Sequence, residues 1–338
     1  MKPKTLLYLS ALIALFAACK PEVDLTSNYK NVTVVYGVLN PDDSIQYIKV
    51  YKGFLVDGDA RIAAQDPDSI SFYKKITVLL EEHNATNQLV KTIELDTTTS
   101  VPISPGDFAN PARVLYWTAE PIRPQSRYKL RILHKETGKE IYAETPIISG
   151  INIRKPASYI SLNVPQSSSF ELRDIEHVAG YSVKLIFYYI EQNIRTREVK
   201  HGKIEKNYTP YLLRSNSFSY IPKEFYTTIA ANLSPNSNVT RYIDGDTCFK
   251  FEVWGGTEEL IRYIEINHPS SSVTQNQRIY TNLISENNSA YGIFAARNNF
   301  SKRFPLLFGS QSEDTLVKGA ATGHLNFDYY RHFQENNK

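Results

Sequence analysis

Hydrophobic and polar residues alternate with a period of two along much of the first half of the chain. Val34, Tyr36 and Val38 alternate with Thr33, Val35 and Gly37, and similar patterns recur further along. Alternation of this kind is typical of strands that bury one face. It predicts strands around residues 33–38, 45–51, 75–81, 89–95, 114–118, 128–134 and 141–147.

Short strands with almost no helix between them predict a β-sandwich. Tyr128 stands four residues after Pro124, at the entrance of an expected strand. This spacing resembles the tyrosine corner of immunoglobulin-type and fibronectin-type domains, in which the phenol hydrogen-bonds a nearby backbone group. The alternative is an ordinary tyrosine at the start of a strand. We therefore expect an immunoglobulin/fibronectin-like β-sandwich over residues 31–149.

The pattern changes after Gly150, where strands begin to mix with helices. Phe225, Ile229 and Leu233 recur at helical spacing soon after a proline that suits a first helical turn. A second helix is expected after Thr257, which can cap it, with glutamates in the first turn. The second domain, residues 150–338, is therefore expected to be strand-rich α+β, with a closing strand pair at residues 279–284 and 291–296.

The N-terminus has the pattern of a bacterial lipoprotein signal. Lys2 and Lys4 precede an apolar run that is too short to span a bilayer. Small residues then precede Cys19, whose thiol would carry a diacylglyceryl group after cleavage. Residues 1–18 are interpreted as the signal peptide, Cys19 as the lipid attachment site and residues 19–30 as a tether. The alternative is an ordinary secretory signal followed by a chance cysteine.

Composition and charge are those of globular domains. Hydrophobic residues make up 42% of the chain and charged residues 22%. The formal net charge is +3, and Lys2 and Lys4 of the expected signal contribute two of those charges. Because the mature chain is close to neutral, nothing points to nucleic acid as a partner. The sequence after the signal contains no apolar run long enough for a membrane helix.

Cys248 is the other cysteine of the chain. If Cys19 carries lipid, Cys248 has no partner for an intramolecular disulfide, so the fold depends on its core. As a functional residue Cys248 would be a nucleophile, although no histidine stands in a recognisable partner motif. The alternative is a small buried hydrophobic residue.

The sequence carries no recognisable motif for catalysis or metal binding. It contains no Gly-rich phosphate loop, no His-Glu-x-x-His zinc motif and no Gly-x-Ser-x-Gly turn, and its seven histidines are scattered singly. We therefore assign no catalytic residue, no metal ligand and no cofactor. Acidic turns at residues 57–59 and 244–246 have the oxygen groups that calcium prefers, and both also suit plain turns. Trp117 and Trp254 are either stacking platforms for a sugar or core residues.

Four short motifs resemble the O-glycosylation signal of exported Bacteroidota proteins. In each motif an Asp is followed by Ser or Thr and then by an aliphatic residue or Thr. The candidate acceptors are Ser44, Ser69, Thr97 and Thr315. The alternative is the turn chemistry that Asp-Ser pairs commonly provide.

Three segments resemble a family of Bacteroidota outer-membrane lipoproteins of unknown function. They are residues 31–40, with Asp43-Ser44 after them, and the late runs at residues 279–283 and 291–295. In relatives the last two runs are joined by a Gly-rich turn, whereas residues 285–290 lengthen and alter that turn here. Members of this family are commonly encoded beside TonB-dependent transporters. The resemblance implies an outer-membrane location and an association with such a transporter, and it supplies no catalytic residue.

Together these features lead us to expect a lipid-anchored, non-enzymatic binding or accessory protein. We expect it at the outer membrane, on the cell surface or the periplasmic face, with a TonB-dependent transporter β-barrel as its partner. One alternative is a hydrolase whose site forms between the two domains, which would require paired carboxylates in a cleft. Another is a purely structural component of the envelope.

Overall fold

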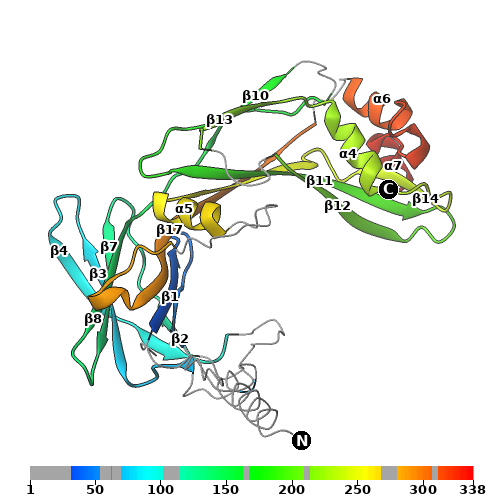
Figure 1. Ribbon diagram of the computed structural model, residues 1–338. Coiled ribbons are helices and arrows are strands. Elements are labelled where there is room, and N and C mark those ends of the chain that lie inside the picture. Colours follow the sequence, from blue (N-terminus) through cyan, green and yellow to red (C-terminus); the bar gives the residue numbers. More distant parts are fainter. Residues whose placement is uncertain are drawn as a thin grey trace, which may run out of the picture.

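The computed structural model describes residues 32–53, 62, 70–101, 114–162, 167–208, 214–267, 280–306 and 311–337 (Figure 1). Within them the chain is mainly β, as the sequence pattern predicts. Buried residues form two large cores: the first takes the buried residues up to Ile147 and some between Leu283 and Ala296, and the second begins at Ile148.

The first unit contains β1 (Val32–Leu39), β2 (Gln46–Gly53), β3 (Ile76–His83), β4 (Leu89–Glu94), β5 (Asp96–Thr98), β6 (Leu115–Thr118), β7 (Arg127–His134) and β8 (Glu140–Pro146). The second contains β9 (Ile153–Lys155), β10 (Ser168–Leu172), β11 (Gly180–Asn193), β12 (Val199–Asn207), β13 (Ser217–Tyr220), α4 (Glu224–Asn232), β14 (Val239–Ile243), β15 (Phe249–Gly256) and α5 (Glu258–Asn267). The chain ends with β16 (Ile284–Ser285), η1 (Glu286–Asn288), β17 (Ala290–Phe304), α6 (Gln311–Lys318), η2 (Gly323–Leu325) and α7 (Tyr330–Asn336).

The first unit is the expected β-sandwich. One sheet has the strand order β16-β8-β7-β3-β4, and the facing layer contains β17-β1-β2-β6-β5. The inward side of β1 carries Val35 and Leu39, which meet Leu80 and Leu130 of the opposite sheet in one core. The side of Val34, Tyr36 and Val38 faces outward, away from that core.

A tyrosine corner holds the entrance to β7, as the sequence predicts. The backbone N–H of Arg123 donates a hydrogen bond of 3.0 Å to the Tyr128 hydroxyl, and the Tyr128 side chain is fully buried. Burial raises the pKa of this phenol. The bond pins the crossover that leads into β7.

The second unit is built on the continuation of the same long sheet, in the order β12-β11-β15-β17, with β14 also paired to β11. A small sheet, β13-β10-β9, and the helices α4 and α6 accompany it (Figure 1). Val183, Leu185 and Phe187 on one side of β11 are buried, in agreement with their alternation in the sequence. Their neighbours in the core include Phe225 and Ile229 of α4.

Both helices that the pattern predicts are present. α4 buries Phe225 and Ile229 and ends before Leu233. α5 begins directly after Thr257, with Glu258 in its first turn. The hydroxyl of Thr257, which was expected to cap the helix, instead accepts a hydrogen bond of 3.4 Å from the backbone N–H of Ala296 in β17. Thr257 therefore joins α5 to the sheet beneath it.

β17 belongs to both units. Its first half, to Ala296, pairs in parallel with β1, and its second half, from Arg297, pairs antiparallel with β15. Phe294 lies in the first core and Phe304 in the second. The expected domain boundary near Gly150 coincides with the change of core, but residues 283–296 return to the first unit, which the sequence did not predict.

The expected closing strand pair at residues 279–284 and 291–296 is not a hairpin. Thr281 forms a single parallel bridge to Gly292, and β16 pairs with β8 instead. The side-chain amide of Asn282 makes two hydrogen bonds of the kind that a neighbouring strand would make. It donates to the Phe294 carbonyl (2.6 Å) and accepts from the Phe294 N–H (3.0 Å). The described parts of the three segments that carry the family resemblance therefore meet at one structural junction.

Candidate functional site

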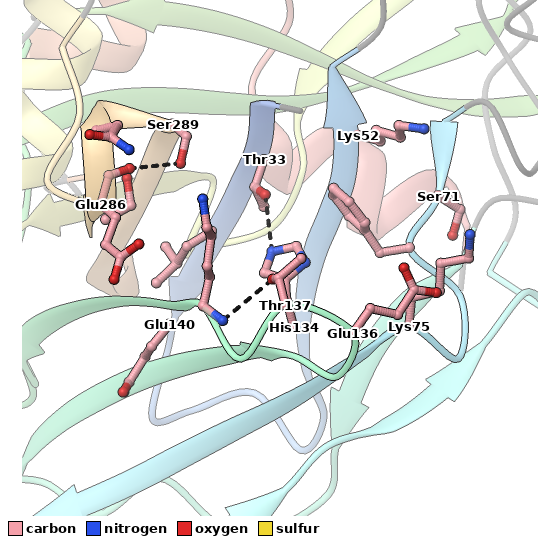
Figure 2. Close-up of a pocket in the computed structure, with 15 residues that line it drawn as sticks. Thr33, Lys52, Ser71, Lys75, His134, Glu136, Thr137, Glu140, Glu286 and Ser289 are labelled. Atoms are coloured by element: carbon pink, nitrogen blue, oxygen red, sulfur yellow. Dashed lines mark hydrogen bonds between the residues drawn. The ribbon is translucent and has the colours of Figure 1, made fainter. Parts of the chain in front are cut away.

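A cavity of about 340 Å³ lies at the end of the first unit where β1 begins (Figure 2). Five separate pieces of chain line it. They are the start of β1 (Thr33), the end of β2 (Lys52), the segment before β3 (Ser71, Phe72, Lys75), the end of β7 through the start of β8 (His134, Glu136, Thr137, Lys139, Glu140, Ile141) and the region of β16 and η1 (Ser285, Glu286, Asn287, Ser289). Its size is at the lower end of the range for small-ligand sites.

Backbone hydrogen bonds fix the walls of this cavity. The N–H of Thr33 donates to the Ser289 carbonyl (2.9 Å), which ties β1 to the segment after η1. The N–H of His134 donates to the Lys139 carbonyl (2.9 Å), which closes the β7–β8 turn. The N–H of Lys135 donates to the Lys75 carbonyl at 2.9 Å. The lining side chains are therefore carried by connected strand ends.

His134 stands at the centre of the cavity wall. Its Nε2 lies 3.4 Å from the Thr33 hydroxyl, and its ring packs edge-on against Phe72 at 4.9 Å between centroids. Burial lowers the pKa of this imidazole, and the Lys139 ammonium lowers it further, against a smaller opposite effect of Glu136. His134 is therefore neutral at pH 7, and its tautomer decides whether Nε2 donates to Thr33 or accepts from it.

The cavity presents charges of both signs. Glu140 is engaged by Arg131, whose Nε lies 2.5 Å from its carboxylate, and this contact lowers the Glu140 pKa. For Thr33 to act as a nucleophile, a general base such as His134 would have to accept its hydroxyl proton, and a third side chain would have to orient that base. Among the residues that the structure describes, no hydrogen bond joins His134 to a carboxylate. The arrangement is thus one of dispersed polar groups around a small space, suited to holding a polar ligand.

A second feature is an aromatic surface on the outward side of the long sheet, which we call the tyrosine face. It consists of Tyr36, Tyr47, Tyr51 and Trp117 on the neighbouring strands β1, β2 and β6. Tyr47 is paired directly opposite Trp117 and is 41% exposed, while Tyr36 is 36% exposed. Their outward direction follows from the burial of the alternate residues of the same strands.

The tyrosine face is held in place at the side where α5 covers the sheet. The Tyr263 hydroxyl of α5 donates to the Tyr36 hydroxyl at 3.3 Å, and the rings of Tyr36 and Tyr51 stack at 6.1 Å between centroids. The Lys49 ammonium lies 4.6 Å from the Tyr51 ring centre. Burial raises the pKa of Tyr51, and its neighbour Tyr36 raises it further. Figure 1 shows α5 where β17 passes between the two units.

The two tryptophans have different positions. Trp254 is half-buried and packs with the small cluster of Leu260, Ile293 and Ala295 between α5 and the sheet, which is a structural role. Trp117 lies on the tyrosine face, so it remains a candidate binding residue. The sequence pattern favours a core position for Trp117 and leaves Trp254 open, whereas the structure packs Trp254 on the small cluster and puts Trp117 on the outward side of the sheet.

The glycosylation candidates fall in three different settings. Ser44 is exposed in the turn between β1 and β2, and Thr97 is exposed on β5, at the edge of the long sheet. Thr315 lies within α6, where its hydroxyl donates to the Gln311 carbonyl at 2.6 Å. Ser69 lies outside the described residues. Modification of Ser44 and Thr97 stays a prediction.

The remaining candidate residues can be placed briefly. Cys19 and the acidic turn at residues 57–59 lie outside the described residues. Asp244 follows β14 and contacts His201 at 2.9 Å, and no cluster of metal-ligating side chains occurs in the described part of the chain. Cys248 is fully buried in the second core, and burial raises the pKa of its thiol. Across the described ranges, no helix is long and apolar enough to cross a membrane.

Comparisons with known proteins add little. No family model and no curated protein matches the chain. Among solved structures, trypsin-activated alpha-2-macroglobulin from Escherichia coli is similar over 68% of this chain, with 7% sequence identity and a TM-score of 0.16. The chain spans 14% of the length of that protein. At this level the match implies neither a shared fold nor a shared function.

Proposed function

We propose that the chain is a lipid-anchored protein of the bacterial outer membrane that acts by contact, as an accessory to a TonB-dependent transporter β-barrel. The tyrosine face is the proposed contact surface. It is the observation that carries the proposal, because it exposes large aromatic side chains on a rigid sheet. Tyr and Trp are enriched in protein interfaces, where they give contact area at a small cost in conformational entropy.

The arrangement of the tyrosine face supports a protein partner. Tyr36 and Tyr51 are fixed by each other and by Tyr263, so they would lose little freedom on binding. Tyr47 and Trp117 extend the surface away from α5, toward the edge strand β5. The lipid anchor would confine the protein to the plane of the membrane. Confinement raises the effective concentration of a membrane-bound partner, so a weak contact would suffice.

Site-specific photo-crosslinking in the native host tests the contact. A photoreactive residue at position 47 should crosslink to an outer-membrane β-barrel protein, which mass spectrometry would identify. The matched control is position 159, because Tyr159 is also an exposed tyrosine, at 49%, but belongs to the second unit. Equal yields from both positions, or recovery of the same proteins with an unrelated lipoprotein, would contradict the proposed contact surface.

The lipid anchor has a separate test. Cys19→Ser should move the protein from the detergent phase to the aqueous phase in detergent partitioning, since no thiol would remain at the cleavage site to accept the diacylglyceryl group. A variant that still partitions into detergent like the wild type would show that the anchor is wrongly assigned. This measurement does not involve the tyrosine face, so the anchor and the contact can fail independently.

A further inference from the structure

The cavity of Figure 2 is lined by charged side chains that form no ion pair within the part of the chain that the structure describes. Lys52, Lys75 and Lys139 form no ion pair with another described residue, and the same holds for Glu136 and Glu286. By contrast, Glu140 on the same wall is neutralised by Arg131. Lys75, Lys139, Glu136 and Glu286 are exposed, so their charges are available to a ligand that carries complementary charges.

The positions of these groups suggest a ligand that carries both charges. Figure 2 places Lys52 and Lys75, with Ser71 and Glu136, on one side of the cavity, and Glu286 and Ser289 on the other. A simple anion would meet repulsion from the carboxylates, and a simple cation would meet repulsion from the lysines. A phosphate group held by lysines and an ammonium group held by Glu286 would satisfy both.

An unpaired hydroxyl gives independent support. The oxygen of Ser285 lines the cavity, is shielded from solvent and has no hydrogen-bond partner among the described residues. A buried polar atom without a partner is costly, by about 1–3 kcal/mol in proteins. Ser285 adjoins the exposed Glu286, so rotation of the serine side chain would let both residues accept from one primary ammonium group at this point.

The place of the cavity in the molecule indicates where such a ligand would come from. β1 begins at Val32, and Thr33 at its start lines the cavity. The 13 Cα-to-Cα steps from Cys19 to Val32 reach at most about 45 Å when fully extended. If Cys19 is the lipid site of the proposed function, the end of the first unit with the cavity lies within reach of the bilayer surface.

We infer that this cavity binds the zwitterionic phosphoethanolamine headgroup of a lipid in the membrane that anchors the protein. The phosphate lies against Lys52 and Lys75, and the ammonium lies against Glu286 and Ser285. The cavity volume accommodates a headgroup, while the acyl chains remain in the bilayer. The inference rests on the lipid anchor of the proposed function and is independent of the tyrosine face.

Calorimetric titration of the full-length protein in detergent tests the ligand chemistry. Glycerophosphoethanolamine should bind, and glycerophosphocholine should bind at least tenfold more weakly, because its trimethylammonium group cannot donate hydrogen bonds to Glu286 and Ser285. Inorganic phosphate should also bind more weakly. Equal binding of the two glycerophosphodiesters, or binding of inorganic phosphate alone, would overturn a zwitterion site, and so would no binding at all.

Two variants separate the two halves of the site. Glu286→Gln should weaken glycerophosphoethanolamine at least tenfold and leave the affinity for inorganic phosphate unchanged. Lys75→Ala should weaken both ligands. The matched control is Lys203→Ala, which removes an exposed lysine of β12 that pairs with Glu205 in the second unit. Thermal melting of each variant establishes that it is folded, and an effect of Lys203→Ala equal to that of Lys75→Ala would overturn the assignment.

Vesicle flotation then identifies the source of the headgroup. The Cys19→Ser protein, which has no lipid anchor, should float with vesicles that contain phosphatidylethanolamine and not with vesicles of phosphatidylcholine alone. The Glu286→Gln change should abolish flotation. Binding of glycerophosphoethanolamine without flotation would overturn the lipid as the source and indicate a soluble phosphoethanolamine compound. Failure of the position 47 crosslink would leave these results unaffected.

Discussion

Gly292 faces the backbone of Val35 so closely that no side chain fits between them. The two residues are paired in the parallel ladder of β1 and β17, and Gly292 has a φ of +104°. A Cβ atom on Gly292 would lie 2.0 Å from the Val35 carbonyl oxygen. This approach is where the last long strand of the chain joins the first.

Gly292→Ala should therefore destabilise the protein by more than about 3 kcal/mol, since the clash is with backbone that cannot move without breaking the ladder. The control is Gly138→Ala, because Gly138 also has a positive φ, of +66°, but nothing lies within 4 Å of its Cβ position. That change should cost about 1 kcal/mol, from backbone strain alone. Denaturant unfolding measures both, and equal losses would mean that the contact with Val35 is not the cause.

Truncation after residue 150 should give a chain that does not fold. The cores do change at this point, but the first core would lose Ala290, Phe294 and Ala296, and β1 would be left with an open edge. Circular dichroism of residues 31–150 should show little stable β structure. Adding a peptide of residues 280–297 should increase the β signal, and a cooperative thermal transition without the peptide would contradict this dependence.

Tyr128→Phe should destabilise the protein by about 1–2 kcal/mol, because the N–H of Arg123 would lose its acceptor at a partly buried position. The matched control is Tyr159→Phe, which removes the hydroxyl of an exposed tyrosine and should have almost no effect. Urea unfolding of both variants makes the comparison. Equal stability of Tyr128→Phe and the wild type would mean that the corner is not held by the phenol.

The sequence predicts the strands of the sandwich well, because alternation is a local property that each strand carries by itself. It does not show which side of β1 is buried, since Val34, Tyr36 and Val38 are as apolar as the inward residues. Nor does it reveal that β17 continues to Phe304 or that its partner is β1. Such pairings depend on residues far apart in the chain.

The cavity was missed for the same reason, since five separate segments contribute to it. One signal was present. Thr33 is a polar residue on the side of β1 that carries Val35 and Leu39, and a polar group in a buried row often has a specific partner. Its partner, His134, lies at the end of a strand about 100 residues later, and nothing in the spacing connects the two.

His134 predicts a pH dependence of stability. Its pKa is lowered in the folded protein, mainly by burial, so the unfolded chain binds more protons as the pH falls below about 6.5. Stability should be complete above that pH and should decrease below it, until the pH reaches the folded pKa. His134→Gln should flatten this part of the stability curve, measured by urea unfolding between about pH 5 and 7. An unchanged slope in the variant would contradict the assignment.

Cys248 should be inert to thiol reagents while the protein is folded. Its side chain is fully buried, and burial raises the pKa of the thiol, so almost no thiolate is exposed to react. Labelling should appear only with unfolding, in step with the loss of the circular dichroism signal. Cys248→Ser should destabilise the protein by about 1–3 kcal/mol, because it buries a hydroxyl among apolar neighbours. Rapid labelling of the native protein would contradict a structural role.

Because β1 pairs with β17, the first unit cannot finish folding until β17 has been synthesised. Thr33 and Ala290 are partners, so the first strand to be synthesised has to wait for nearly the last. At about 5–20 residues per second, translation alone delays that encounter by more than ten seconds. During this time β1 has an unpaired edge and an apolar row without cover, which is the state in which chains aggregate. A chain with this connectivity gains from being kept unfolded and accompanied until its C-terminal third has arrived, and a chaperone that holds the early strands would raise its yield more than one that accelerates their collapse.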